Sequence, residues 1–215
     1  MLLALSALLV LVLLCWAARL AWLLRSSRAR PSGNPPIRTM AVLGSGGHTA
    51  EMIQLLQRLD RTQYGPMLYV IADTDKTSAQ KIETFERNVA SPGAAEAAHR
   101  LLIVPRSREV GQSYVTSALT TLVALFHSVA HVFRTMPSLV LCNGPGTCVP
   151  ICAAALLVRL LGIKYITLVY VESVCRVETI SLSGKIMIRL ADHFLVQWPA
   201  LTKKYPRAQY IGRLC

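Results

Sequence analysis

The sequence predicts an α/β protein in which an N-terminal transmembrane helix precedes one Rossmann-like domain with a doubly wound parallel sheet. Short, nearly continuous apolar runs alternate along the chain with longer stretches that have helical spacing. A glycine-rich turn joins the first apolar run to the first helical stretch. Parallel strands buried on both faces have this continuous apolar character, and the helices between them provide the crossover connections.

Residues 39–215 are long enough for one such domain. The strands are expected at Thr39–Leu43, Met67–Ala72, Leu101–Val104, Leu139–Cys142, Tyr165–Val171, Phe194–Gln197 and Gln209–Ile211. The helices are expected at Thr49–Leu59, Lys76–Asn88, Ser113–Phe133, Val149–Leu161, Ser183–Leu190 and Pro199–Tyr205. Ser91–Ala98 is rich in alanine, glycine and proline, so we expect a surface loop there.

Residues 1–24 are almost entirely apolar and predict a transmembrane anchor, because they are long enough to cross a hydrocarbon core of about 30 Å. Residues 25–38 follow as a basic linker with several arginines, and the first acidic residue of the chain is Glu51. This asymmetry predicts a single-pass protein with its N-terminus across the membrane and its domain in the cytosol. A cleaved signal peptide is disfavoured, since its positive charge would precede the apolar stretch.

The formal net charge of +12 and the mean hydropathy of +0.44 also indicate a protein that works beside a membrane. The basic residues concentrate in the second half of the chain, which suggests anionic headgroups or a phosphate substrate. Nucleic acid is disfavoured as a partner because no recognised nucleic-acid motif accompanies the charge. The long apolar helix expected at Ser113–Phe133 either packs in the core or lies against the membrane.

The six cysteines include no Cys-x-x-Cys pair. Cys148 and Cys152 would share a helix face, but no second ligand pair lies near them in sequence. Structural zinc needs four ligands, so we interpret the cysteines as reduced core thiols and predict no metal site.

The first glycine-rich turn reads Gly44-Ser45-Gly46-Gly47-His48. Backbone N–H groups and a helix N-terminus converge in such a turn and favour anions such as a diphosphate. A dinucleotide site is disfavoured, because Thr49 occupies the third glycine position of the G-x-G-x-x-G pattern. His48 would face the ligand, and the positive helix end favours a neutral imidazole that acts as base or hydrogen-bond partner. A histidine that only caps the helix is the alternative.

A second turn of the same kind, Asn143-Gly144-Pro145-Gly146-Thr147, follows the fourth expected strand. Two such turns on neighbouring strands could hold a diphosphate from both sides, although a plain strand–helix turn is the alternative. The predicted diphosphate-binding residues are Gly44, Ser45, Gly46, Gly47, Gly144, Gly146 and Thr147. Glu172, after the fifth strand, is placed either for hydroxyl binding or proton abstraction, or for an ion pair with Arg176.

Residues 44–52, 143–147 and 171–185 read GSGGHTAEM, NGPGT and VESVCRVETISLSGK. Together they resemble the membrane-anchoring subunits of bipartite N-acetylglucosaminyltransferases, which correspond to the acceptor half of MurG-like GT-B glycosyltransferases. In that pattern the first two segments match the two glycine loops, His48 belongs to the first loop, and Glu172 matches the acidic position after the fifth strand.

The resemblance implies a subunit that binds dolichyl-diphospho-GlcNAc at the endoplasmic reticulum membrane and recruits a small cytosolic catalytic partner. The complex would add the second GlcNAc of the N-glycan precursor with inversion, and this chain would be inactive alone. UDP-GlcNAc would be a co-substrate held mainly by the partner, and no cofactor is implied. The catalytic candidates are His48 and Glu172, while a base supplied by the partner stays open.

The C-terminal residues are expected at the partner interface, since the chain ends where a GT-B enzyme would continue into its second domain. These residues are Tyr210, Ile211, Gly212, Arg213, Leu214 and Cys215. An exposed, dispensable tail is the alternative. Two other functions compete with the transferase subunit. One is a pure membrane scaffold without site residues, and the other is a membrane-anchored NAD(P) oxidoreductase, disfavoured by Thr49.

Overall fold

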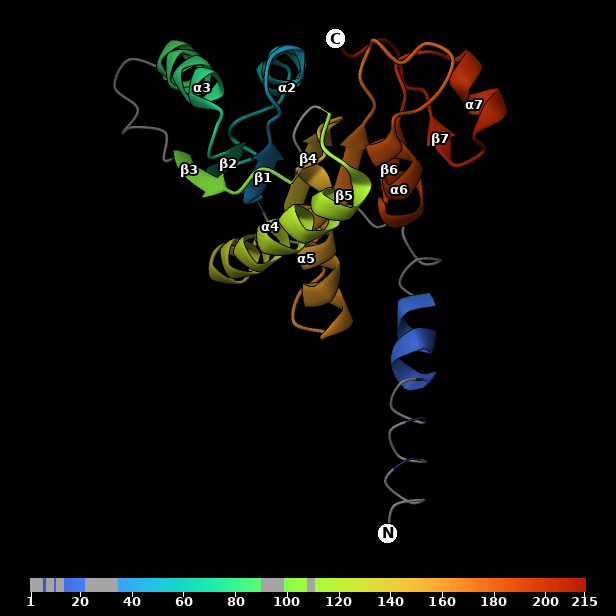
Figure 1. The fold of residues 1–215 in the computed structure, drawn as a ribbon. Helices are drawn as coiled ribbons and strands as arrows, with labels where there is room; N and C mark the ends of the chain where they lie inside the picture. Colours follow the sequence, from blue (N-terminus) through green and yellow to red (C-terminus); the bar gives the residue numbers. More distant parts are fainter. Residues whose placement is uncertain (1–5, 7–9, 11–13, 22–34, 90–98, 108–110) are drawn as a thin grey trace.

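A computed structural model describes residues 6, 10, 14–21, 35–89, 99–107 and 111–215 of the chain. Its strands form one seven-stranded sheet, all parallel, in the order β3-β2-β1-β4-β5-β6-β7 (Figure 1). The strands are β1 (Thr39–Val42), β2 (Met67–Ala72), β3 (His99–Val104), β4 (Leu139–Asn143), β5 (Thr167–Val171), β6 (His193–Leu195) and β7 (Ala208–Gln209). The predicted doubly wound parallel sheet is confirmed.

Helices cover both faces of the sheet, with α2 and α3 on one face and α4, α5 and α6 on the other (Figure 1). The helices are α2 (Gly47–Gln57), α3 (Lys76–Val89), α4 (Tyr114–Thr135), α5 (Cys148–Leu160), α6 (Leu182–Leu190) and α7 (Ala200–Lys204). All six predicted helices are present. The last strand ends two residues earlier than predicted, because the chain leaves the sheet edge there and Ile211 is 64% exposed.

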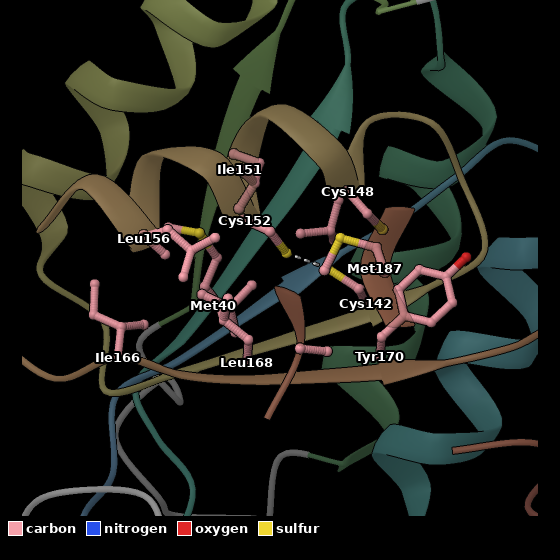
Figure 2. Close-up of a cluster of buried hydrophobic side chains, with 14 of the residues drawn as sticks. Met40, Cys142, Cys148, Ile151, Cys152, Leu156, Ile166, Leu168, Tyr170 and Met187 are labelled. Atoms are coloured by element: carbon pink, nitrogen blue, oxygen red, sulfur yellow. Dashed lines mark hydrogen bonds between the residues drawn. The ribbon is translucent and has the colours of Figure 1, made fainter. Parts of the chain in front are cut away.

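Successive side chains of the central strand β1 enter two separate hydrophobic clusters, because strand side chains alternate between the faces of a sheet. Met40 and Val42 pack in the cluster under α5, and Ala41 and Leu43 pack in the cluster under α2. Figure 2 shows the first cluster, in which Ile151, Cys152 and Leu156 of α5 lie over side chains of the strands. Full burial of a side chain of this size stabilises the fold by about 1.5–3 kcal/mol.

The cysteines follow the prediction only in part. Cys142, Cys148 and Cys152 are buried free thiols, and the Sγ atoms of Cys142 and Cys152 lie 3.5 Å apart (Figure 2). Burial raises the pKa of Cys142 and Cys148, so these thiols stay protonated. The core-thiol prediction is wrong for Cys15 and Cys175, which are exposed. Cys175 lies in the loop after β5, outside any apolar run.

Most of the predicted anchor (1–24) and linker (25–38), and the predicted loop Ser91–Ala98, lie outside the described residues. Residues 14–21 are helical and exposed, on the side of the sheet covered by α4, α5 and α6 (Figure 1). In the described part of the chain, one helix, Val115–Thr135, is long and apolar enough to cross a membrane. It lies in the middle of the chain, and only 22% of its apolar window is buried.

Candidate functional site

The two glycine turns meet where the strand order of the sheet reverses. β1 leads to β2 and β3 on one side, whereas β4 leads to β5 and β6 on the other. β1 and β4 pair directly, so their carboxyl ends and the turns that follow them lie side by side. Open α/β sheets bind ligands in the crevice at such a switch point. The predicted pairing of the two turns is therefore confirmed.

A buried threonine, Thr49, stabilises the conformation of the first turn through hydrogen bonds. The hydroxyl of Thr49 donates to the carbonyl oxygen of Gly44 and lies 2.5 Å from the Ser78 hydroxyl. Ser78 in turn donates to the Asp75 carboxylate over 2.6 Å. A glycine at position 49 would remove the hydroxyl that bonds the Gly44 carbonyl oxygen, while Ser78 would keep its bond to Asp75. Thr49, which replaces the third glycine of the dinucleotide pattern, thus fixes the loop by hydrogen bonds. In the dinucleotide pattern, a glycine at this position instead allows close packing of the helix.

The two turns contact each other at two glycines. A side chain at Gly44 would bring its Cβ within 2.6 Å of the Pro145 Cβ. Gly144 has φ of +73°, and a Cβ there would lie 2.7 Å from Nδ1 of His48. Both positions therefore need glycine, and at Gly144 the positive φ is a second reason. The imidazole of His48 packs directly on the second turn.

A cavity of about 860 Å³ opens between the two turns. Polar groups line one part of it, and side chains from α4, α5 and α6 add apolar surface. Its lining includes Gly44, Ser45, His48, Arg106, Ser107, Thr121, Leu122, Gly144, Gly146, Thr147, Val149, Leu182 and Ile186. Among the described residues of this lining, His48 and Arg106 are the ionisable ones and none is acidic.

Two buried polar atoms of the lining have no hydrogen-bond partner among the described residues. They are Nδ1 of His48 and Oγ of Ser107. Buried polar atoms are nearly always paired, because an unpaired one costs about 1–3 kcal/mol. A polar ligand in the cavity would supply the missing partners.

The helices that begin at the two turns differ from their neighbours at the N-terminus. Ser113 caps α4 and Ser181 caps α6, each through its side-chain oxygen. Neither α2 nor α5 has a side-chain cap or an acidic residue in its first turn. The first N–H groups of a helix need partners from outside it. In α5 they are largely used, because Cys148 and Val149 donate to the carbonyl oxygens of Pro145 and Gly146 and Pro150 has no N–H. The start of α2 is therefore the one of the two that leaves donors available for an anion.

The predicted site residues divide into three groups. Gly44, Ser45, His48, Gly144, Gly146 and Thr147 line the cavity. Gly46 and Gly47 are exposed at the start of α2 and do not line it. Glu172 is fully buried and also does not line it.

The environment of Glu172 is that of a loop anchor. Its carboxylate accepts hydrogen bonds from the backbone N–H of Ser181 at 3.0 Å, the Ser181 hydroxyl at 3.2 Å and the Ser173 N–H at 3.2 Å. Burial raises the pKa of Glu172 above its ordinary value of 4.5, while these hydrogen bonds act in the opposite direction. Its hydrogen bonds run to these two serines, and Arg176, the partner considered from sequence, makes none with it.

The sequence reasoning missed Arg106, Ser107 and Glu51. The first two directly follow β3 and could have been found by the rule that polar residues at carboxyl ends of strands face the site. Glu51 of α2 is buried and accepts from Asn143 Nδ2 at 2.9 Å and from the Ser173 hydroxyl at 2.7 Å. It thereby links α2 to the ends of β4 and β5.

The C-terminal residues fold back onto the domain. The N–H of Leu214 donates to Gln197 Oε1 over 2.8 Å, and its side chain packs against the hydrophobic cluster under α2. The guanidinium of Arg213 lies 4.9 Å from the ring centre of Trp198. Tyr210 and Ile211 are exposed, at 42% and 64%. The segment is thus ordered against the domain with an exposed aromatic and aliphatic pair.

Sequence comparison places relatives along nearly the whole chain. The family described as "Oligosaccharide biosynthesis protein Alg14 like" matches residues 39–214. UDP-N-acetylglucosamine transferase subunit ALG14 of Homo sapiens is 52% identical over 177 residues, which are 81% of this chain and 82% of the relative. The protein of the same name from Yarrowia lipolytica is 40% identical over 218 residues, which are 99% of this chain and 97% of the relative.

Two solved structures share the fold. MurG of Acinetobacter baumannii matches with a TM-score of 0.56 and 15% identity, over 82% of this chain and 44% of the MurG chain. UDP-N-acetylglucosamine 2-epimerase of Rickettsia bellii matches with a TM-score of 0.52 and 12% identity, over 83% of this chain and 45% of the epimerase chain. This chain spans less than half the length of either protein. On the family match and the identity to its relatives, the chain belongs to the Alg14-like family of oligosaccharide biosynthesis proteins.

Proposed function

We propose that this chain is the membrane-anchoring, acceptor-binding subunit of a heteromeric glycosyltransferase. The complex adds the second GlcNAc to dolichyl-diphospho-GlcNAc during synthesis of the N-glycan precursor. The observation that carries the proposal is the cavity between the two glycine turns, which combines unpaired polar atoms with an apolar flank. The names of the relatives from Homo sapiens and Yarrowia lipolytica support a transferase subunit.

The diphosphate of the acceptor lies at the glycine turns. The uncapped N-terminus of α2 offers backbone N–H groups, and the N-terminal ends of α2 and α5 each carry about half a positive charge. Thr147 and Ser45 add hydroxyl groups to the lining of the same cavity.

The lipid tail of the acceptor runs from the cavity along an apolar track. Leu122 of α4 and Leu182 and Ile186 of α6 line the cavity and are partly exposed. The exposed face of α4 extends this track through Val115, Leu119, Val123 and Phe126. Residues 14–21 lie on the same side of the sheet (Figure 1). We infer that this side faces the endoplasmic reticulum membrane, with the domain in the cytosol and the N-terminus in the lumen.

The catalytic partner supplies the UDP-GlcNAc site. The likeness to MurG covers less than half of the MurG chain, which is consistent with a donor half carried by another protein. Tyr210–Cys215 contribute to the surface that recruits this partner. The exposed pair Tyr210 and Ile211 is the apolar part of that surface.

The reaction is an inverting transfer. The acceptor's 4-hydroxyl attacks C1 of the donor GlcNAc while the bond between C1 and the UDP oxygen breaks. UDP leaves, and a base removes the hydroxyl proton. His48 is the base of first choice, because its side chain lines the cavity beside the diphosphate turns. Glu172 is less suited, since its carboxylate is buried and engaged by Ser173 and Ser181. We assign it to holding the loop that carries α6.

Reconstitution tests the proposal. The purified full-length chain is combined with and without its catalytic partner, dolichyl-diphospho-GlcNAc and UDP-GlcNAc. The account predicts transfer only by the assembled complex, together with binding of the diphosphate lipid by this chain alone. Robust transfer by the isolated chain would contradict it. Transfer that needs the chain but survives loss of every cavity residue would favour the pure scaffold.

A further inference from the structure

Arg106 is the one formally charged side chain in the described lining of the cavity at pH 7. It follows β3, so it reaches the cavity from a different strand than either glycine turn. The ion pairs among the described residues are Arg61–Glu86, His99–Glu86 and Arg159–Asp192, and none involves Arg106. Arg106 thus has no carboxylate partner in the described part of the chain, and none of the described lining residues is acidic. This arrangement favours an anionic ligand.

The segment that carries Arg106 is held by α4. The carbonyl oxygen of Ser107 accepts from the Thr120 hydroxyl at 2.8 Å and from the Thr121 hydroxyl at 3.1 Å. Ser107 lines the cavity and is 3% exposed, and its buried hydroxyl has no hydrogen-bond partner among the described residues. Arg106 and the Ser107 hydroxyl therefore form a second polar wall in addition to the two glycine turns.

Charge balance indicates different roles for the two glycine turns and for the wall formed by Arg106 and Ser107. Two helix N-termini supply together about one positive charge. One positive charge balances one phosphate of the sugar-linked lipid diphosphate, in which each phosphate carries a single negative charge. The charge of the other phosphate is left without a balancing group. The guanidinium fork of arginine binds phosphate oxygens in pairs and is always charged, which suits it to the second phosphate.

We propose that Arg106, assisted by the Ser107 hydroxyl, makes the acceptor site selective for a lipid diphosphate over a lipid monophosphate. This inference rests on the proposed function, because it requires the cavity to be the acceptor site. Arg106 binds the second phosphate, whereas the glycine turns hold the first. Its contribution is to ground-state binding and specificity, which distinguishes it from the base His48.

The test measures binding of farnesyl diphosphate and farnesyl monophosphate to the full chain in complex with its partner. Arg106→Gln removes the charge, and Arg106→Lys keeps the charge but loses the fork. Arg87→Gln is the matched control, because Arg87 is an exposed arginine of α3, on the opposite face of the sheet. We expect Arg106→Gln to weaken diphosphate binding by about 10- to 100-fold, a loss typical of one charged phosphate contact. Monophosphate binding should change by less than about threefold.

Arg106→Lys should lie between wild type and Arg106→Gln, and Arg87→Gln should bind both probes as wild type does. Ser107→Ala should weaken diphosphate binding by about threefold to tenfold and carries the test if Arg106→Gln fails to fold. Unchanged diphosphate selectivity in folded Arg106→Gln would overturn the inference while leaving the proposed function intact. If the wild-type complex binds neither probe, the acceptor site itself is misplaced and both proposals fall.

Discussion

The imidazole of His48, at the start of α2, packs on the backbone of Gly144, in the turn after β4. This contact joins the two glycine turns across the switch point of the sheet. It also orients the ring, because the ring lies so close to Gly144 that a Cβ atom at position 144 would collide with it. The position of the candidate base therefore depends on a glycine almost a hundred residues away in sequence.

Gly144→Ala should disturb both the fold and the site. Alanine at φ of +73° costs about 1–2 kcal/mol, and the new Cβ would lie 2.7 Å from His48 Nδ1, which displaces the ring. We expect a lower melting temperature and at least about a tenfold lower kcat. Gly146→Ala is the stability control, since nothing lies within 4 Å of its Cβ position and its φ is not positive. Equal melting temperatures for the two variants would contradict this account.

Thr49→Val should loosen the first glycine turn. The substitution keeps the side-chain shape but removes the hydroxyl that bonds Gly44 and Ser78. Ser78 keeps its bond to Asp75, but leaving the buried Gly44 carbonyl unpaired costs about 1–3 kcal/mol. Amide hydrogen exchange of residues 44–48 should become faster than in wild type. Thr84→Val, at an exposed position of α3, should leave this exchange unchanged.

Glu172→Gln should change how stability depends on pH. Because burial raises the pKa of Glu172 in the folded state, its contribution is fully present below its ordinary pKa of 4.5. That contribution is lost as pH rises through the raised folded pKa. The stability of wild type relative to Glu172→Gln should therefore fall as pH increases from about 4 to 8 in thermal unfolding. A difference that is constant over this range, or that grows with pH, would show that burial does not dominate at Glu172.

The partner surface can be separated from the fold by point substitutions. Tyr210→Ala with Ile211→Asp changes exposed side chains, so it should leave stability within about 0.5 kcal/mol while reducing co-purification of the partner at least tenfold. Leu214→Ala should instead lower stability by about 1 kcal/mol, since Leu214 packs on the core. Undiminished co-purification by the double variant would place the interface elsewhere. Deleting residues 211–215 is a weaker test, because it removes part of the expected interface together with the contact between Leu214 and the core.

The sequence predicted the sheet and the meeting of the two turns, because continuous apolar runs and glycine turns are local signals. The orientation of Glu172 was not predictable in the same way. Whether a side chain at a strand end faces the crevice or the neighbouring helix depends on contacts such as those with Ser181, nine residues further on. The position of Arg106 after β3 made it a candidate that the sequence could have offered. Its place in the cavity, however, also depends on how α4 holds the segment after β3.

The turnover of His48→Ala in the assembled complex tests the central claim most directly. General-base catalysis is worth about 10²–10⁴-fold, so kcat should fall by at least about 100-fold while partner binding and diphosphate-lipid binding persist. Wild-type turnover by His48→Ala together with an inactive Glu172→Gln would reverse the two roles. Full activity in both variants would contradict the account, since the base would then lie in the partner and this chain would only present the lipid.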